Sequence, residues 1–588
     1  MEASRAGTSE PLTEEPSLTE PAADSAPLSS PRATPRASAV SALLARPYMV
    51  DALALAALVL AVAFLWGRAL GTWFWEDEAI AVGVAEHSLG QIPEVLRQDG
   101  SPPFYYALLH VWMSLFGTSE VATHVLSLIF GVAIIPIALW AGWSLFGRRA
   151  GWICAGLAAL NPYLALFSTE TRMYSLVALL SVLVSAAFLH AFVYRRRKYA
   201  VMFAVALVLL MYTHNWGILF AAGAGLALVP CLVQSSDRKR LFLDAALAFG
   251  AAALAYLPWL PTLLYQRSQD LQPWALPATL VDVRDTVVFV LGGIGVATAL
   301  ALVFGLGVAA MAWRPWSRPA LSVVALGVIA GVVLLGGWRT VLTYRYMGAV
   351  LGPLLIALAA ALAYAGRMAI AAIAVAILLT APIGAKGPPY QKSNARAVGE
   401  SVAPSLRPGD IVLSPNFEFV PLAAYYLPDG LRYLDANGPV PDVGVVDWRD
   451  ANERLRRGDP ARTLPPVIND VPVGGRVLVV CPPTGAGAPA LQGTPGAESI
   501  GPSTEVGEGI EEAAVGQTTP VPNSVVLFHA LNRFRCKQVQ AMLREDRRLE
   551  LEQELIAPVT DVRATAMDGL LFEKVTNEVP DAEEAPES

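Results

Sequence analysis

The sequence predicts a polytopic α-helical membrane protein with about 11 transmembrane helices and a C-terminal extracytoplasmic α/β domain. Apolar residues make up 55% of the 588 residues. Charged residues make up 15%, whereas soluble proteins carry about 25%. A soluble fold cannot bury so much apolar surface. The net charge of -7 excludes a nucleic-acid-binding protein, which needs a basic surface, and the 4 cysteines are too few for a disulfide scaffold.

Residues 1–47 predict a disordered cytoplasmic tail. They hold seven prolines and no aromatic residue, a composition that cannot bury enough apolar area to offset chain entropy. The first long apolar run begins too late for a cleavable signal peptide.

Residues 48–385 predict the transmembrane domain, because apolar stretches of bilayer-spanning length follow one another along them. Eleven spans are expected: 49–69, 121–146, 150–167, 174–194, 199–213, 217–233, 241–263, 287–312, 319–337, 346–365 and 368–385.

The charges of the connecting loops predict the orientation in the cell membrane. Alternate loops carry twelve cations on one side and six on the other, and the positive-inside rule assigns the richer side to the cytoplasm. An odd number of spans then places the N-terminus in the cytoplasm and the C-terminal domain outside. The twelve cations are Arg148, Arg149, Arg195, Arg196, Arg197, Lys198, Arg238, Lys239, Arg240, Arg314, Arg318 and Arg367.

Residues 386–588 predict the extracytoplasmic α/β domain. Short apolar runs between Gly and Pro turn signals predict strands over 410–414, 476–481 and 570–575, and a helical pattern covers 529–555.

A Gly/Pro-rich stretch near 482–522 predicts a disordered insert within this domain. Cys481 and Cys536 can pair if the outer compartment is oxidising, a question that the sequence leaves open.

A run of acids follows the first span, in the segment 73–78. It contains three aromatic residues and then Glu76, Asp77 and Glu78. Aromatic rings suit the headgroup region, so one interpretation is a solvated loop with interface anchors. The other is a general base or metal ligand at the membrane surface, because adjacent acids raise each other's proton affinity.

Residues 79–97 predict an amphipathic helix that lies in the membrane interface. The Pro102–Pro103 pair then fixes a rigid turn. Taken alone this is a structural turn, but it also brings Asp99 back toward Asp77.

Further polar residues follow in later outer loops. Arginines at helix ends often only snorkel to the headgroups, yet a guanidinium is also well shaped to bind a phosphate with two donors. A lone histidine at such a turn is more often an interface residue than a ligand. These residues are Glu170, Arg172, Tyr174, His214, Arg345 and Tyr346.

The unusual charges therefore all fall on the predicted outer face. A site for an anionic, membrane-embedded substrate needs this asymmetry. A channel or an ion-coupled transporter would instead place polar residues within its spans.

From Leu53 to Tyr426 the chain resembles the GT-C superfamily of polytopic glycosyltransferases, within the branch of protein O-mannosyltransferases and the lipid A aminoarabinose transferase (glycosyltransferase family 39-like). Ser101 departs from the pattern, since many relatives have a histidine there, and no histidine or metal-ligand role is carried over to it. The matching motifs are Asp77-Glu78, Pro102-Pro103-Phe104-Tyr105-Tyr106, Glu170-Thr171-Arg172-Met173-Tyr174, Tyr212-Thr213-His214, Arg345-Tyr346, Asn394-Ala395-Arg396-Ala397, Arg407-Pro408-Gly409-Asp410 and Ala424-Tyr425-Tyr426.

The resemblance implies an inverting transfer of a sugar from a polyprenyl-phosphate donor to an extracytoplasmic glycan, lipid or protein of the cell envelope. Inversion needs a base for the acceptor hydroxyl, and Asp77 is expected to be this base, with Glu78 orienting the acceptor or sharing the proton. The leaving phosphate needs fixed positive charge. Arg172 and Arg345 are expected to supply it, with hydroxyls from Tyr174 and Tyr346, and Asp99, His214, Glu170 and Tyr105 are further candidate members of the site.

Other activities and a metal requirement stay open at the level of sequence. A lipid-linked polysaccharide ligase or polymerase would share this topology, and a membrane transporter or an inactive scaffold is the alternative outside enzymes. Two or three acids beside a phosphate can bind Mg²⁺ or Mn²⁺ or act without an ion. The sugar, whether mannose, arabinose or another pentose, also stays open.

Overall fold

The structure, a computed structural model, describes most of the chain between residues 47 and 578. The predicted tail, most of the predicted insert and most of the predicted last span lie outside the described residues. Residues 56–588 form one unit by their internal contacts. The described residues are 47–269, 271–273, 275, 278–312, 317–368, 371, 374, 378, 391–483, 523–555 and 562–578.

Eight helical segments among these residues are long and apolar enough to cross a membrane. Each overlaps one of the predicted spans, so the polytopic helical fold is confirmed. The segments are Met49–Gly67, Glu120–Phe146, Tyr174–Val193, Trp216–Gln234, Arg238–Ser268, Ile294–Met311, Arg318–Arg339 and Tyr344–Tyr364.

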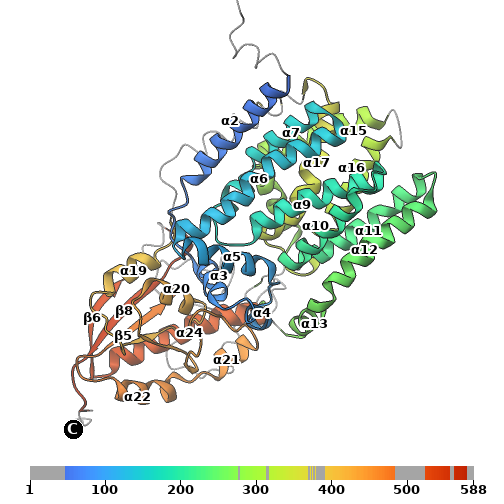
Figure 1. Cartoon of the computed structure of the whole chain (residues 1–588). Helices are drawn as coiled ribbons and strands as arrows, with labels where there is room; N and C mark the ends of the chain where they lie inside the picture. The colour runs from blue at the N-terminus through green and yellow to red at the C-terminus, as the bar shows by residue number, and fades with distance from the viewer. Residues whose placement is uncertain are drawn as a thin grey trace, which may run out of the picture. The chain divides into compact units, whose positions relative to one another are not determined.

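The helices from Pro47 to Tyr364 make up the membrane part of the chain and are shown in Figure 1. They are α2 (Pro47–Gly67), α3 (Glu76–Glu86), α4 (Ile92–Asp99), α5 (Phe104–Phe116), α6 (Glu120–Phe146), α7 (Arg148–Ala159), α8 (Pro162–Phe167), α9 (Tyr174–Phe188), the π-helix η1 (Leu189–Val193), α10 (Tyr199–Thr213), α11 (Trp216–Gln234), α12 (Arg238–Tyr256), the 3₁₀-helix η2 (Leu257–Trp259), α13 (Leu260–Ser268), α14 (Leu280–Val290), α15 (Ile294–Ala312), α16 (Arg318–Arg339), the 3₁₀-helix η3 (Tyr344–Met347) and α17 (Gly348–Tyr364).

Two of the other predicted spans are described but are not among these eight segments. The span over 199–213 is the short apolar helix α10. The span over 150–167 is interrupted, because α7 ends at Ala159 and α8 begins at Pro162. The Asn161 side chain caps α8 by accepting a hydrogen bond from Leu164 N at 3.2 Å.

The bundle has a buried centre and an apolar outside. In the segments Tyr174–Val193 and Tyr344–Tyr364, 94% and 83% of an 18-residue apolar window are buried. The two segments pack against each other through α9 and α17. Outer helices instead expose large apolar side chains, among them Val201 on α10 and Leu247 on α12, each 70% exposed. Such exposure suits contact with lipid tails and would be unfavourable in water.

The predicted interfacial helix over 79–97 is wrong in two respects. It is divided into α3 and α4, and residues 78–85 of α3 are all buried. The reason is that protein covers α3 on more than one side. It contacts α5 of the membrane part and α20 (Phe419–Tyr426) of the C-terminal part, so it lies between the two (Figure 1).

The C-terminal part is an α/β domain, as predicted. Its six-stranded sheet has the order β4-β3-β2-β5-β8-β6, in which β2 runs parallel to β3 and β5, and β8 runs antiparallel to β5 and β6. β1 and β7 form a separate parallel pair. The strands are β1 (Gln391–Ser393), β2 (Ile411–Leu413), β3 (Arg432–Asp435), β4 (Gly438–Pro439), β5 (Arg476–Cys481), β6 (Leu549–Leu555), β7 (Val562–Thr565) and β8 (Asp568–Lys574).

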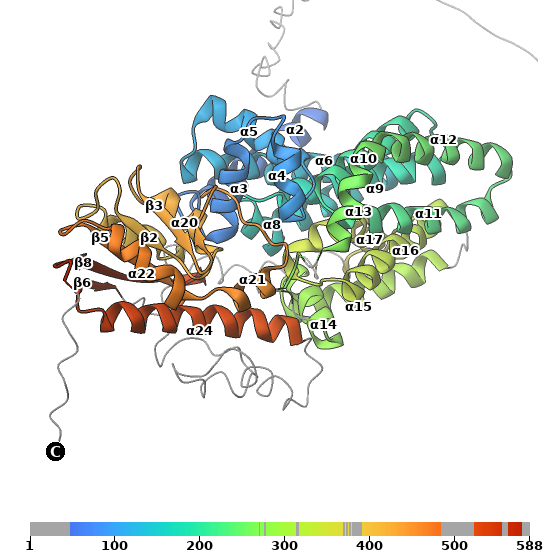
Figure 2. The ribbon, with the colours of Figure 1, turned by 90° about the horizontal axis from the view of Figure 1, so that it is seen from below.

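All three predicted strands are present, as β2, β5 and β8. The predicted helix over 529–555 is wrong at its C-terminal end, because α24 ends at Glu545 and β6 follows. The alternating burial of β6 is typical of a strand with one solvated face. Figure 2 shows α24 running along this sheet. The other helices of the domain are α19 (Ala395–Val402), α21 (Ala451–Arg457), α22 (Pro460–Asp470) and α24 (Asn523–Glu545).

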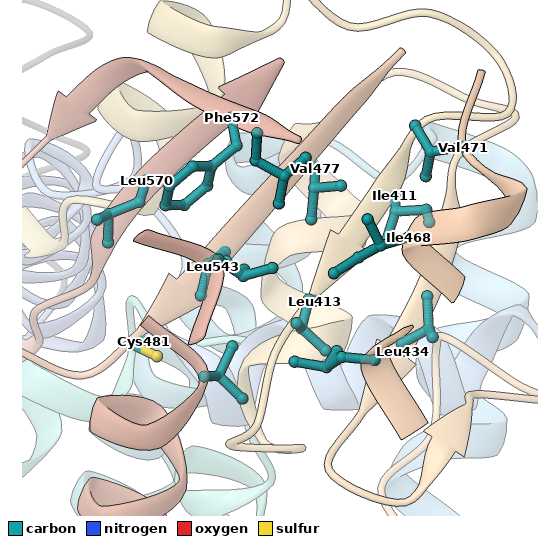
Figure 3. Packing of buried hydrophobic residues seen from close by; sticks show 14 of the residues in the cluster. Ile411, Leu413, Leu434, Ile468, Val471, Val477, Cys481, Leu543, Leu570 and Phe572 are labelled. Atoms are coloured by element: carbon teal, nitrogen blue, oxygen red, sulfur yellow. The ribbon is translucent and has the colours of Figure 1, made fainter. Parts of the chain in front are cut away.

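The core of the α/β domain lies between the sheet and helices α22 and α24 (Figure 3). Leu413 of β2, Val479 of β5 and Phe572 of β8 pack there against Ile468 and Leu543. Cys481 and Cys536 are joined by a disulfide bond, which links β5 to α24. The structure thus answers the question of cysteine pairing that the sequence leaves open.

Candidate active site

A cavity of about 310 Å³ collects most of the predicted site residues. Residues from helix ends and loops of the membrane part line it, together with Trp448 of the α/β domain. Seven of the ten predicted site residues belong to the lining: Asp77, Asp99, Arg172, Tyr174, His214, Arg345 and Tyr346.

Asp77 lies on the first turn of α3 and faces two arginines. Arg345 Nη1 donates a hydrogen bond to Asp77 Oδ2. Arg172 Nη2 lies 3.9 Å from the same oxygen, and Arg172 Nη1 donates to the Asp77 main-chain carbonyl at 3.2 Å. The N-terminus of a helix also favours a carboxylate. The predicted acid and the predicted late guanidinium therefore meet in one cavity.

Arg172 is a buried cation with an unused donor. It lies in the loop between α8 and α9, and its Nη1 is 3.5 Å from the Tyr106 hydroxyl. Its guanidinium lies 5.7 Å from the centre of the Tyr174 ring. Among the described residues, its Nε has no hydrogen-bond partner. This group can therefore still donate to an anion in the cavity.

His214 and Tyr346 form an aromatic wall of the cavity, with ring centres 4.5 Å apart. Burial, with the nearby Arg172 charge, lowers the pKa of His214 to about 3, so the ring is neutral at physiological pH. Nδ1 accepts a hydrogen bond from Trp216 N at 3.1 Å. The ring proton is therefore on Nε2, which makes His214 a neutral donor.

Asp99 lines the same cavity from the last residue of α4. The turn at Pro102 thus places Asp99 near Asp77, as the sequence predicts. Burial raises the pKa of Asp99, the Arg172 charge and Ser101 lower it, and the Asp77 carboxylate raises it further. The net direction is upward, so this carboxyl keeps its proton to a higher pH than an exposed aspartate.

Glu78 does not line the cavity, which corrects the expectation that it orients the acceptor. Its Oε1 lies 2.7 Å from His124 Nε2 and accepts a hydrogen bond from Thr171 N at 2.7 Å. The reason is helical geometry. Successive residues of an α-helix point about 100° apart, so Asp77 faces the cavity while Glu78 faces the protein interior.

Lys392 is a partner of Glu78 that sequence reasoning missed. Its Nζ lies 2.6 Å from Glu78 Oε1, and it also donates to Thr169 O at 2.8 Å. Burial alone would raise the pKa of Glu78, but the Lys392 charge and His124 outweigh it, so the pKa is lowered. Lys392 lies two residues before the Asn394 motif, yet no spacing signal connects it with position 78.

Two further predicted members lie behind the cavity wall. Tyr105 is fully buried on α5, and Glu170 is 7% exposed in the loop that carries Arg172. Burial is the largest cause that raises the pKa of Glu170 to about 7; Lys392 lowers this pKa and Glu78 raises it. Neither side chain belongs to the cavity lining.

The part of the chain that the structure describes contains no group of three or more His, Cys, Asp and Glu side chains that could hold a metal ion. Two carboxylates, of Asp77 and Asp99, line the cavity, and Asp77 is already paired with two guanidiniums.

Comparison with known proteins identifies the fold. No family model and no curated protein matches the sequence. ArnT from Cupriavidus metallidurans in the apo state superposes with a TM-score of 0.52 at 17% identity, over 74% of this chain and 94% of that chain. The same protein bound to undecaprenyl phosphate superposes with a TM-score of 0.51 at 16% identity, over 74% and 93%. The chain thus has the GT-C fold that the sequence motifs predict.

Proposed function

We propose that this chain is an inverting glycosyltransferase that moves a sugar from a polyprenyl phosphate to an acceptor outside the cytoplasm. The pairing of Asp77 with Arg172 and Arg345 in one cavity carries this proposal. The fold shared with ArnT supports it, since one ArnT structure is bound to undecaprenyl phosphate. We expect a pentosyl or hexosyl donor and an acceptor in the cell envelope.

In the proposed reaction, the bond between the sugar and the acceptor forms in the same step in which the bond between the sugar and the phosphate breaks. The acceptor hydroxyl attacks the anomeric carbon and gives its proton to the Asp77 carboxylate. The bond from that carbon to the phosphate oxygen breaks, and its electron pair leaves with the polyprenyl phosphate. Attack from the face opposite the leaving group inverts the anomeric configuration.

The arginines would stabilise the leaving phosphate. A phosphate that gains negative charge is best stabilised by donors already held in place, because no reorganisation is then needed during the reaction. Arg172 is held in this way by its contacts with the Asp77 carbonyl and the Tyr106 hydroxyl, while its Nε keeps no partner among the described residues. Neutral His214 would add an uncharged donor.

The ion pair between Arg345 and Asp77 would also limit proton acceptance by Asp77 until the donor binds. Before the donor binds, Arg345 is bound to Asp77. An incoming phosphate competes for the same guanidinium, so Asp77 would become a freer proton acceptor only when the donor is present.

The test replaces the base without changing its shape. Cells that lack the protein should accumulate its lipid-linked donor, and intact mass analysis of their lipids and glycans identifies donor and product. The wild-type chain should restore the product. Asp77→Asn should lower transfer by about 100-fold or more, while the purified variant still binds undecaprenyl phosphate.

Glu76→Gln is the matched control, because Glu76 precedes Asp77 on the same helix but does not line the cavity. It should restore the product as the wild type does. Near-normal transfer by Asp77→Asn would remove Asp77 as the base. An accumulated donor that carries a preassembled glycan instead of one sugar would identify a ligase or polymerase.

A further inference from the structure

Two side-chain amides cap the C-terminal end of α4 beside the cavity. Gln266 Nε2 donates a hydrogen bond to Leu96 O at 2.8 Å. Asn215 Nδ2 donates to Gly100 O at 3.0 Å. A main-chain carbonyl can only accept, so these contacts fix which end of each amide is nitrogen. The two amide oxygens are therefore turned away from these carbonyls.

Three acceptor oxygens near this end of α4 have no hydrogen-bond partner among the described residues. They are Gln266 Oε1, Asn215 Oδ1 and Asp99 Oδ2. Gln266 is only 6% exposed, so bulk water does not satisfy it. All three residues line the cavity. A buried acceptor without a donor destabilises the empty site, and a ligand that supplies donors would relieve this penalty.

Because all three unpaired atoms are hydrogen-bond acceptors, a ligand that satisfies them must supply hydrogen-bond donors. An apolar chain would leave the three oxygens unpaired, and a second phosphate would bring only further acceptors. A ring with several hydroxyl groups supplies a donor to each. Trp216 and Trp448 also line the cavity, and an indole face suits the apolar C–H face of such a ring.

We propose that Asp99, Asn215 and Gln266 form a subsite for the hydroxyl groups of a sugar ring. The proposal rests on the proposed function and extends it, because it assigns the phosphate to Arg172 and Arg345 and the sugar to the end of α4. Trp448 N donates to Gln98 O on this same helix end at 3.1 Å. The α/β domain would thereby close one side of the sugar subsite.

The experiment compares ligands with and without a sugar on the purified full chain. The probes are undecaprenyl phosphate, undecaprenyl phosphate carrying mannose, glucose, galactose or arabinose, and free manno- and arabino-oligosaccharides. Tryptophan fluorescence follows binding, because Trp216 and Trp448 line the cavity. Gln266→Met keeps the length of the side chain and removes both polar atoms.

A second variant of Gln266 separates the role of its amide oxygen from that of the nitrogen that caps α4, and a variant at another position serves as the control. Gln266→Glu keeps an acceptor oxygen and replaces only the nitrogen that binds Leu96. Gln91→Met is the matched control, since Gln91 lies before α4, is exposed and does not line the cavity. We expect Gln266→Met to weaken binding of the best sugar-bearing probe by about tenfold, the effect of one lost hydrogen bond. Gln266→Glu should weaken it less and Gln91→Met not at all.

The outcomes identify the source of the sugar. A loss confined to sugar-bearing lipids assigns the subsite to the donor sugar, and a loss confined to free oligosaccharides assigns it to the acceptor. Equal weakening of sugar-free undecaprenyl phosphate would overturn the subsite, as would wild-type protein that prefers no sugar-bearing probe. A wild-type chain that fails to bind undecaprenyl phosphate would instead contradict the proposed function.

Discussion

Asp77 and Glu78 show how two neighbouring acids acquire different environments. Asp77 is 21% exposed in its side chain and meets two arginines, whereas the Glu78 side chain is fully buried with His124 and Lys392. Glu78 also accepts from Thr171 N, next to Arg172. Its network therefore holds both the helix that carries the proposed base and the loop that carries an arginine proposed to bind the phosphate.

Glu170 should give phosphate binding a pH dependence. Its pKa is raised to about 7, mainly by burial, so the carboxyl is neutral below this pH and becomes charged above it. The new negative charge would then oppose an anion bound beside Arg345. A charge interaction on the order of 1 kcal/mol corresponds to about fivefold in affinity. We expect the charge of Glu170 to make undecaprenyl phosphate bind about fivefold more weakly at pH 8 than at pH 6, apart from the effect of the titration of the lipid phosphate itself.

Glu170→Gln should remove this difference, since it cannot ionise. The ratio of wild-type to variant affinity at each pH cancels the titration of the lipid phosphate itself. Glu94→Gln, a change of an exposed glutamate on α4, should keep the wild-type profile. A ratio that is constant between pH 6 and pH 8 would exclude Glu170 as the titrating group.

At the scale of elements, α3 is held between the membrane part and the α/β domain. Glycine allows the close approach on one side. A Cβ built on Gly83 would lie 2.6 Å from Gly444 Cα and 2.7 Å from its carbonyl carbon. Both neighbours are backbone atoms, so no flexible side chain can move away. Direct backbone contact thus positions the helix that carries Asp77.

Gly83→Ala should destabilise the docking of α3. An overpacked contact typically costs about 1–3 kcal/mol, and the shifted helix would move Asp77 away from Arg345. We expect a lower midpoint of thermal unfolding and a lower rate of transfer. Gly90→Ala is the control, because a Cβ at Gly90 meets no atom within 4 Å. Equal stability of the two variants would show that the contact with Gly444 does not constrain α3.

At the scale of the whole molecule, the basic loops and the cavity lie at opposite ends of the central helix. Tyr174, at the start of α9, lines the cavity, while Arg195 and Arg197 follow its far end and pair with Asp244. Arg149, after α6, contacts Gly366 after α17 at this same end. With the positive-inside rule, this end is expected in the cytoplasm and the cavity outside.

Cysteine labelling tests this orientation. A membrane-impermeant maleimide added to intact cells should label Glu94→Cys on α4 and leave Lys239→Cys, in the first turn of α12, unlabelled. Both positions are exposed. The native background is low, because Cys154 and Cys231 are buried and Cys481 and Cys536 are bonded. The reverse labelling pattern would invert the proposed topology and place the site in the cytoplasm.

The sequence alone determined the class of protein, most of the spans and the three strands, and it predicts the face that carries the site. Each of these properties depends on residues that are close to one another in the sequence. Hydropathy accumulates along a span, loop charges follow the positive-inside rule, and strands alternate with turn signals. The residues Asp77, Arg172 and Arg345 were also identifiable, because each belongs to a short motif of charged and aromatic residues at a helix end.

Only the tertiary structure decided which of these side chains face the cavity and which partners each of them contacts. Lys392 lies 314 positions from Glu78, and Gln266 lies 170 positions from Leu96. Such pairs leave no pattern in the local sequence. Whether an acid faces a cavity or the interior depends on its angle around a packed helix. That angle is set by contacts from both parts of the molecule, and these contacts exist only after the chain has folded.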